Sequence, residues 1–245
     1  MVATKTVEGW ILPDSEIHFE KVLTTAKKGS TLGEYQKAPR DKALEQVTSF
    51  RRAIDIGACV GFWSRDLCDR FEHVDCFEMH EENAECLEQN LAEKKNCTIH
   101  HIGLSDRRGT DTIYINGEAL GSASFFSGGV KYTKTATANY TRLDDFNFTD
   151  VDFIKMDVQF HELQALKGAR KTLERNSPVL CIECCRRTSD EFIYVARIIE
   201  YLLFLGYQIT GEFGKELFFS KTSEPIRKHY FSSLLERLNY VPFKS

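Results

Sequence analysis

The sequence has no long hydrophobic run. No segment reaches the roughly 18 apolar residues that a membrane-spanning helix requires, and the first residues lack the apolar core of a signal peptide. Positive charge is not in excess either, because 32 lysines and arginines stand against 36 aspartates and glutamates, for a formal net charge of −4. These absences disfavour a membrane protein and a protein that mainly binds nucleic acid, and they favour a cytoplasmic location.

Internal repeats, low-complexity tracts and long linkers rich in glycine or proline are absent as well. The 245 residues suffice for one sizeable α/β domain, and we expect a single domain with an extension over 1–50, a core over 51–222 and a tail over 223–245. The eight cysteines follow no regular disulfide spacing, so we expect reduced thiols. Cys181 and Cys184 lack a second pair that would complete a zinc site, and we expect no bound metal. The sequence does not define an oligomeric state.

From residue 51 onward, segments typical of strands and helices alternate, which predicts a mostly parallel sheet covered on both faces. We expect five parallel strands, over residues 52–58, 73–79, 97–104, 151–158 and 177–184. Helices are expected over about 41–50, 62–71, 81–95 and 190–205, and another carries Leu163, Leu166, Ala169 and Leu173 on one stripe. Residues 109–117 and 132–146 are typical of hairpins, and 206–213 with 215–221 predict a terminal antiparallel hairpin. Residues 1–50 show little regular pattern before residue 41.

A glycine turn follows the first of these strands. Asp55 ends the strand, and Gly57, Ala58 and Gly61 follow in a D-x-G-x-x-x-G spacing. Nicotinamide-binding turns usually read G-x-G-x-x-G, whereas Cys59 stands here in place of the middle glycine. This difference favours a ligand that has no pyrophosphate but carries charges of its own.

S-adenosylmethionine meets that description, with an ammonium group that Asp55 could hold. A second acidic residue is then expected at the end of the next strand, to bind the ribose hydroxyls. Glu78 lies there, 23 residues beyond Asp55, with Met79 next to it. The alternative is that Asp55 and Glu78 only cap neighbouring helices.

Several blocks in order resemble the FkbM-type methyltransferase family, whose fold is a Rossmann-like class I methyltransferase sandwich. They are "DIGACVGFWS", "FEMHEENAECLEQNL", "GLSD", "TRLDDF" and "VDFIKMDVQFHELQALKGARKTLERNSPVLCIE". The resemblance implies transfer of a methyl group from S-adenosylmethionine to a hydroxyl oxygen, often on a sugar or a polyketide-like acceptor. It also implies cofactor contacts by Asp55, Gly57, Gly61 and Glu78, and by Ser105 with Asp106, near the turn where adenine is commonly held.

One motif departs from that family. Its pattern after the fourth strand is D-[VI]-E-G-x-E, whereas this chain has Asp157-Val158-Gln159-Phe160-His161-Glu162. Phe160 replaces a glycine, and we expect its bulk to reshape the acceptor side of the pocket, where it could stack on a ring-shaped acceptor or simply cover the helix start.

The end of the fourth strand borders the cofactor cleft in this topology, so we expect the chemistry there. An alcohol acceptor must lose a proton, and Asp157 is the first candidate base. His161 is also suited to that task, with Asp157 orienting it. Lys155 is expected to pair with a carboxylate, and Glu162 to support the helix start. Mg²⁺ shared by Asp157 and Glu183 is a weaker alternative.

Three functions remain open at this point. The first is an O-methyltransferase that acts on a small-molecule or sugar hydroxyl. The second is an RNA 2′-O-methyltransferase, and the third is a non-catalytic binding protein built on the same frame. The sequence does not identify the acceptor, but we expect it to lie against the N-terminal extension, the "LGSASFFSGG" loop and Phe160 with His161.

Overall fold

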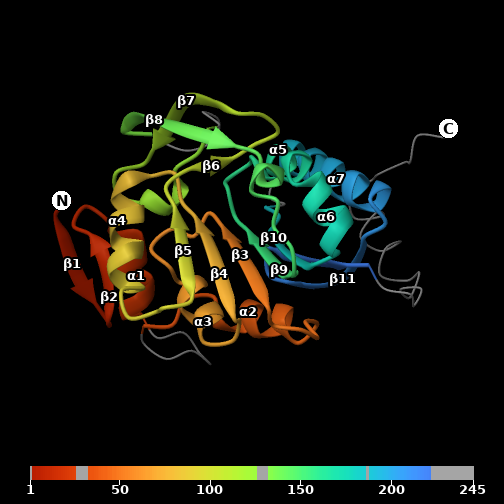
Figure 1. Ribbon diagram of the computed structural model, residues 1–245. Helices are drawn as coiled ribbons and strands as arrows, with labels where there is room; N and C mark the ends of the chain where they lie inside the picture. The colour runs from red at the N-terminus through yellow and green to blue at the C-terminus, as the bar shows by residue number, and fades with distance from the viewer. Residues whose placement is uncertain (1, 26–32, 126–131, 186–187, 222–245) are drawn as a thin grey trace.

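A seven-stranded sheet forms the centre of the molecule (Figure 1). The computed structural model describes residues 2–25, 33–125, 132–185 and 188–221, so the predicted tail over 223–245 lies outside the described residues. The strand order is β11-β12-β10-β9-β3-β4-β5. In chain order the strands are β3 (Arg52–Ile56), β4 (His73–Phe77), β5 (Cys97–His100), β9 (Val151–Met156), β10 (Val179–Glu183), β11 (Gln208–Phe213) and β12 (Glu216–Ser220).

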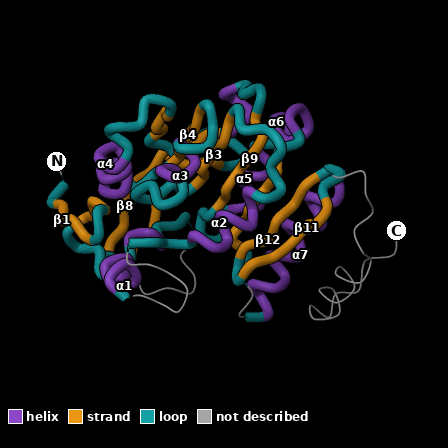
Figure 2. Tube along the Cα trace, turned by 90° about the horizontal axis from the view of Figure 1, so that it is seen from below, coloured by secondary structure: helices purple, strands orange, loops and turns teal. Residues whose placement is uncertain are grey.

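The pairing directions confirm the predicted topology. Strands β10, β9, β3, β4 and β5 run parallel, as five apolar strands linked by helical crossovers should. β12 pairs antiparallel with both β10 and β11, so the last two strands form the expected terminal hairpin at one edge, which Figure 2 shows from below. Strand order reverses between β3 and β9, and in open α/β sheets this is where ligands bind, beyond the carboxyl ends of the strands.

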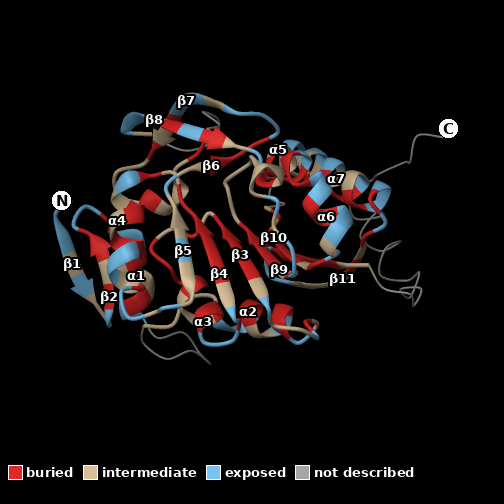
Figure 3. Ribbon diagram, viewed as in Figure 1, coloured by how far each residue is buried: buried red, intermediate tan, exposed pale blue. Residues whose placement is uncertain are grey.

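Alternate residues of each central strand face opposite layers of helices. One layer contains α5 (Glu162–Gly168), α6 (Arg170–Asn176) and α7 (Ser189–Phe204), packed on Ile54, Ile154 and Ile182. The other contains α2 (Lys37–Leu44), α3 (Ser64–Cys68) and α4 (Glu81–Asn90), packed on Ala53, Val74 and Phe153. Both faces are therefore apolar, and Figure 3 shows the central strands buried along most of their length.

The predicted third strand is two separate strands. Cys97–His100 joins the central sheet as β5, but β6 (Gly103–Leu104) pairs with β8 (Lys134–Thr141), which in turn pairs antiparallel with β7 (Gly109–Ile115). The chain bends between the two strands, where the Ile102 amide bonds the His100 carbonyl at 2.9 Å. The small sheet β6-β8-β7 lies above the central sheet in Figure 1.

The N-terminal extension is more regular than expected. β1 (Thr4–Val7) and β2 (Trp10–Pro13) form a hairpin, followed by α1 (His18–Thr24). The Asn90 side chain on α4 bonds both the amide and the carbonyl of Ile11 on β2, which fixes the hairpin beside α4. The predicted helix over 41–50 instead spans Lys37–Leu44, with Pro39 tolerated in its first turn.

The predicted helix over 190–205 is present as α7 at the same length, whereas the other helices are shorter than predicted. α3 covers only Ser64–Cys68 of the predicted 62–71, and α4 stops at Asn90. The helix predicted around Leu163–Leu173 is interrupted at Ala169, which separates α5 from α6. In the part of the chain that the structure describes, no helix combines the length and apolarity that crossing a membrane would demand. All eight cysteines carry free thiols.

Candidate active site

A cavity of about 260 Å³ opens at the carboxyl ends of the central strands. One wall comes from the loops after β3 and β4, another from the loop after β9 and the end of β10, and a third from the N-terminal extension and residues 119–125. Four predicted cofactor residues line it, as do both predicted catalytic residues: Gly57, Ala58, Glu78, Met79, Asp157 and His161. The predicted residues outside the lining are Asp55, Gly61, Ser105 and Asp106.

Gly57 allows the loops after β3 and β9 to touch. Its φ is +76°, and a Cβ built there would lie 1.9 Å from the carbonyl oxygen of Asp157. Any side chain would force the two loops apart, so only glycine fits. Gly61 has a φ of +98° and packs instead against Leu87 of α4, so its role is to bring the turn onto that helix.

Glu78 points into the turn from the end of β4. One carboxylate oxygen accepts the amide of Cys59 and the other the amide of His80, both at 2.8 Å. Burial raises the pKa of Glu78, and these two amides oppose that shift. Each carboxylate oxygen has a second lone pair, so Glu78 can still accept hydrogen bonds from a ligand in the cavity.

Asp55 lies beneath the turn and away from the cavity. It is fully buried, and its carboxylate accepts the Ser64 hydroxyl at 2.6 Å and lies 3.5 Å from the ammonium group of Lys155. We predicted a direct contact between Asp55 and the cofactor, but the position of Asp55 suits an indirect role. Asp55 holds Lys155, and the ammonium group of Lys155 donates to the Gly57 carbonyl at 2.9 Å.

Lys155 is a buried cation in the cavity wall, on the opposite face of β9 from Met156. Burial alone would lower the pKa of Lys155, but the carboxylates of Asp55 and Asp157 outweigh it and raise the pKa overall. The predicted pairing with a carboxylate is therefore present.

Asp157 and Glu183 lie side by side at the ends of β9 and β10, since the register pairs Met156 with Ile182 just before them. The Gln159 amide nitrogen donates to Asp157 at 2.7 Å and to Glu183 at 3.3 Å. Lys215, from the turn between β11 and β12, donates to Glu183 at 3.1 Å. All four side chains line the cavity. The sequence assigns no role in the site to Gln159 or Lys215, and it names Glu183 only as an alternative ligand for Mg²⁺.

His161 lines the cavity at a distance from that cluster. Its Nε2 lies 3.0 Å from the Ser105 hydroxyl, and its ring contacts Phe125 with centroids 5.0 Å apart. Burial lowers the pKa of His161, so the neutral imidazole dominates at neutral pH. No bond joins it to Asp157 among the described residues, so Ser105, not Asp157, holds its ring.

Phe160 turns away from the main cavity. The backbone keeps a turn that suits glycine, with φ of +52° at Gln159 and +69° at Phe160. The Phe160 ring meets Tyr194 of α7, with centroids 6.0 Å apart, in a smaller recess that Glu162 also lines. The expected effect on the acceptor side therefore comes through Gln159, and Phe160 does not line the cavity.

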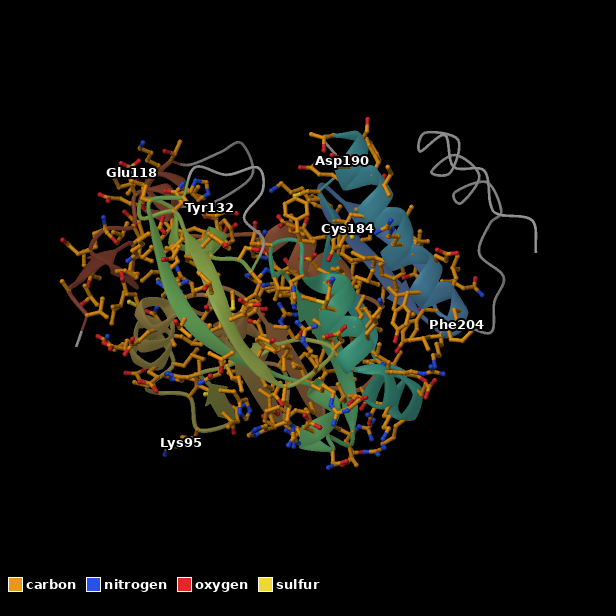
Figure 4. All side chains as sticks on the ribbon, turned by 90° about the horizontal axis from the view of Figure 1, so that it is seen from above. Lys95, Glu118, Tyr132, Cys184, Asp190 and Phe204 are labelled. Carbon is orange, nitrogen blue, oxygen red and sulfur yellow. The ribbon has the colours of Figure 1, made fainter. Side chains whose placement is uncertain are left out.

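The remaining walls come from segments that sequence reasoning named only broadly. Phe19, Tyr35 and Gln36 of the N-terminal extension face the cavity, as do Leu120–Ala123 of the loop after β7. The Glu16 carboxylate accepts the amide of Phe19 at 2.9 Å and the amide of Leu120 at 2.6 Å, which joins the two segments. Figure 4 shows Glu118 and Tyr132 on the small-sheet side of the molecule, opposite Cys184 and Asp190 near α7.

The donor set fits S-adenosylmethionine. A carboxylate at Glu78 suits ribose hydroxyls, and Met79, Leu104 and Phe125 offer apolar walls for a flat ring. Asn83 is buried and lines the cavity, and within the part of the chain that the structure describes its amide oxygen has no hydrogen-bond partner, so it can accept from a ligand. For a metal the fit is poor: nowhere in the described residues do three or more histidine, cysteine, aspartate or glutamate side chains gather around one point.

The fold and this cavity define a Rossmann-like class I methyltransferase sandwich. The chain belongs to the family of the methyltransferase FkbM domain, whose model matches residues 55–209. A search of curated protein sequences gives no match.

A comparison with solved structures gives matches at low sequence identity. The methyltransferase FkbM from Methylobacillus flagellatus KT is 19% identical over 88% of this chain, with a TM-score of 0.51. The match covers 48% of that structure, so this chain spans about half its length. A precorrin-6y C5,15-methyltransferase from Geobacter metallireducens GS-15 is 17% identical, over 84% of this chain and 95% of the other, with a TM-score of 0.45. An rRNA methylase from Streptococcus thermophilus is 12% identical, over 77% of this chain and 99% of the other, with a TM-score of 0.47.

Proposed function

We propose that the protein is an S-adenosylmethionine-dependent O-methyltransferase that acts on a hydroxyl of a small-molecule or carbohydrate acceptor. The observation that carries the proposal is the cavity at the switch point of the sheet, with Glu78 on its β4 side and Asp157 on its β9 side. Family membership supports the same reaction class.

The residues of the cavity divide between two tasks. On the β4 side, Glu78, Asn83 and the side-chain-free Gly57 would hold the cofactor. When bound, S-adenosylmethionine supplies a methyl carbon on a positively charged sulfur, which keeps the bonding electron pair as the methyl leaves. On the β9 side, Asp157 would accept the proton that the acceptor hydroxyl gives up.

The wall around Asp157 is suited to a small, uncharged acceptor. Phe19 and Tyr35 offer apolar and aromatic surface, while Gln159 and Glu183 offer polar contacts. Ammonium groups are not in excess in the lining, where Lys155 and Lys215 stand against the carboxyl groups of Glu78, Asp157 and Glu183. This charge balance does not favour a phosphate-rich acceptor such as RNA.

Isothermal titration with S-adenosylmethionine tests the proposal. We expect binding by the wild type and a loss of at least about tenfold in affinity for Glu78→Gln, because a neutral amide is a weaker acceptor for ribose hydroxyls. Glu81→Gln, an exposed change three residues further along, serves as the matched control and keeps wild-type affinity. No heat of binding at millimolar ligand would sink the proposal.

A further inference from the structure

Gln159 makes a contact that the family pattern does not contain. The pattern has glutamate at this position, whereas the Gln159 amide nitrogen here uses its two hydrogens on two carboxyl groups, at 2.7 Å to Asp157 and 3.3 Å to Glu183. A glutamate in the same place could donate neither bond and would add a third carboxylate. The backbone of Gln159 is in the left-handed region, at a φ of +52°, a strained conformation that structures retain where a side chain must be aimed.

The two carboxyl groups lie close together in the cavity wall. The Glu183 side chain is 10% exposed, and the Gln159 amide nitrogen that donates to it also donates to Asp157. Burial and then the Asp157 charge raise the pKa of Glu183, while Lys215 opposes the shift. Other charged or titratable groups close to the pair come from each neighbouring element: Lys155 on β9, Glu162 on α5, Cys181 on β10, Glu216 on β12 and Tyr35 from the N-terminal extension.

We propose that Gln159 and Glu183 are positioning residues for Asp157, and that Gln159 holds the two carboxyl groups together as a pair that carries one proton and one negative charge. The inference rests on the proposed function, because the pair contributes to catalysis only if Asp157 receives the proton of the acceptor. It also identifies the acceptor as one that still holds its proton when it binds, such as an alcohol.

The proton balance follows from this state. The resting pair carries one proton, which lies on Glu183, and Asp157 is ionised. The proton of the acceptor hydroxyl goes to Asp157, which leaves two neutral carboxyl groups. Loss of one proton to water then restores the resting pair. Because the neutral Glu183 carboxyl can donate its hydrogen to Asp157, it fixes the direction in which the Asp157 lone pairs point.

Carbon-13 NMR of the side-chain carboxyl groups, followed through a pH titration of the full chain, tests the pair without an acceptor. Glu78, Glu162, Glu183 and Glu216 should all titrate above the usual glutamate range near 4.3, and we expect one of these raised titrations, that of Glu183, to vanish in Glu183→Gln. In Asp157→Asn its midpoint should fall by about one unit or more, a tenfold loss in proton affinity, because the neighbouring charge is gone. Gln159→Glu should raise the midpoint, since it replaces two donors with a further negative charge.

Glu174→Gln, an exposed change on α6, is the matched control and should leave the raised titration in place. Persistence of every raised signal in Glu183→Gln, or an unchanged midpoint of the Glu183 signal in Asp157→Asn, would overturn the pair. Titration calorimetry with S-adenosylhomocysteine on the same samples reports separately on the proposed function. A wild type that shows the shared proton but binds no S-adenosylhomocysteine refutes the cofactor assignment alone.

Discussion

The two loops that meet at Gly57 both contain left-handed backbone at residues other than glycine. Cys59 has a φ of +53° in the loop after β3, and Gln159 and Phe160 have φ of +52° and +69° in the loop after β9. Each such residue costs roughly 1–2 kcal/mol unless it is glycine. The chain therefore tolerates strain at three side-chain-bearing residues of these two loops, of which Cys59 and Gln159 line the cavity.

The strain at Phe160 can be measured by comparing the stabilities of two variants at this position. Both Phe160→Ala and Phe160→Gly lose the ring contact with Tyr194, but only glycine relieves the left-handed backbone. We therefore expect the glycine variant to be more stable than the alanine variant by about 1 kcal/mol, the reverse of the usual order in regular structure. Urea unfolding of both variants measures the difference. An alanine variant that equals or exceeds the glycine variant in stability would show that the position is not strained.

Helix α5 begins with a buried carboxyl group. Glu162 is 3% exposed, and its Oε1 accepts the amide of Val158 at 3.2 Å, so it ties the start of α5 to the loop after β9. Burial raises the pKa of Glu162 to about 7. The support of the helix start is therefore a hydrogen bond that the Val158 amide donates to a carboxyl group, which is largely neutral at mildly acidic pH.

This helix start predicts a pH dependence of stability. Because the pKa of Glu162 is higher in the folded protein than in the unfolded chain, the stability that Glu162 contributes is complete below about pH 4.5. This stability is lost as the pH rises through about 7. The corresponding loss in the free energy of unfolding is roughly 3 kcal/mol, as the rise in the pKa of Glu162 implies. Glu162→Gln keeps an oxygen that can accept the Val158 amide but cannot ionise. Between pH 5 and pH 8 its free energy of unfolding should therefore fall by about 3 kcal/mol less than that of the wild type.

Urea unfolding at the two pH values checks the prediction, with the exposed Glu174→Gln as control. The other buried glutamates with a raised pKa, Glu78, Glu183 and Glu216, act in the same direction in both proteins and cancel from the comparison. Equal pH dependence in the wild type and Glu162→Gln would contradict the account of this helix start.

At the scale of the elements, apolar runs predicted the central sheet well, because strands buried on both faces are apolar along their length. The division between β5 and β6 was missed, since the run from Cys97 to Leu104 contains no proline and its only glycine starts the second piece. The early end of α4 was missed for a similar reason: polar residues continue a helical pattern past Asn90, whereas the contacts of Asn90 with β2 are visible only in the fold.

At the scale of the whole molecule, the sequence predicted where the site lies better than which residues form it. Strand ends converge by topology, which placed Gly57, Glu78 and Asp157 together. The sequence could not show that the Asp55 side chain lies beneath the turn and away from the cavity. Which face of the sheet a side chain at a strand end points to depends on the register of the strand. Tyr35 and Gln36 enter the site from a distant segment with no local motif, and no spacing rule predicts such contacts.

The most direct measurement of the central claim is a crystal structure of the protein with S-adenosylhomocysteine. The account predicts the ligand in the cavity, with its ribose hydroxyls on the Glu78 carboxylate and its sulfur on the side that faces Asp157. Density for the ligand at another site, or a ribose turned away from Glu78, would contradict it.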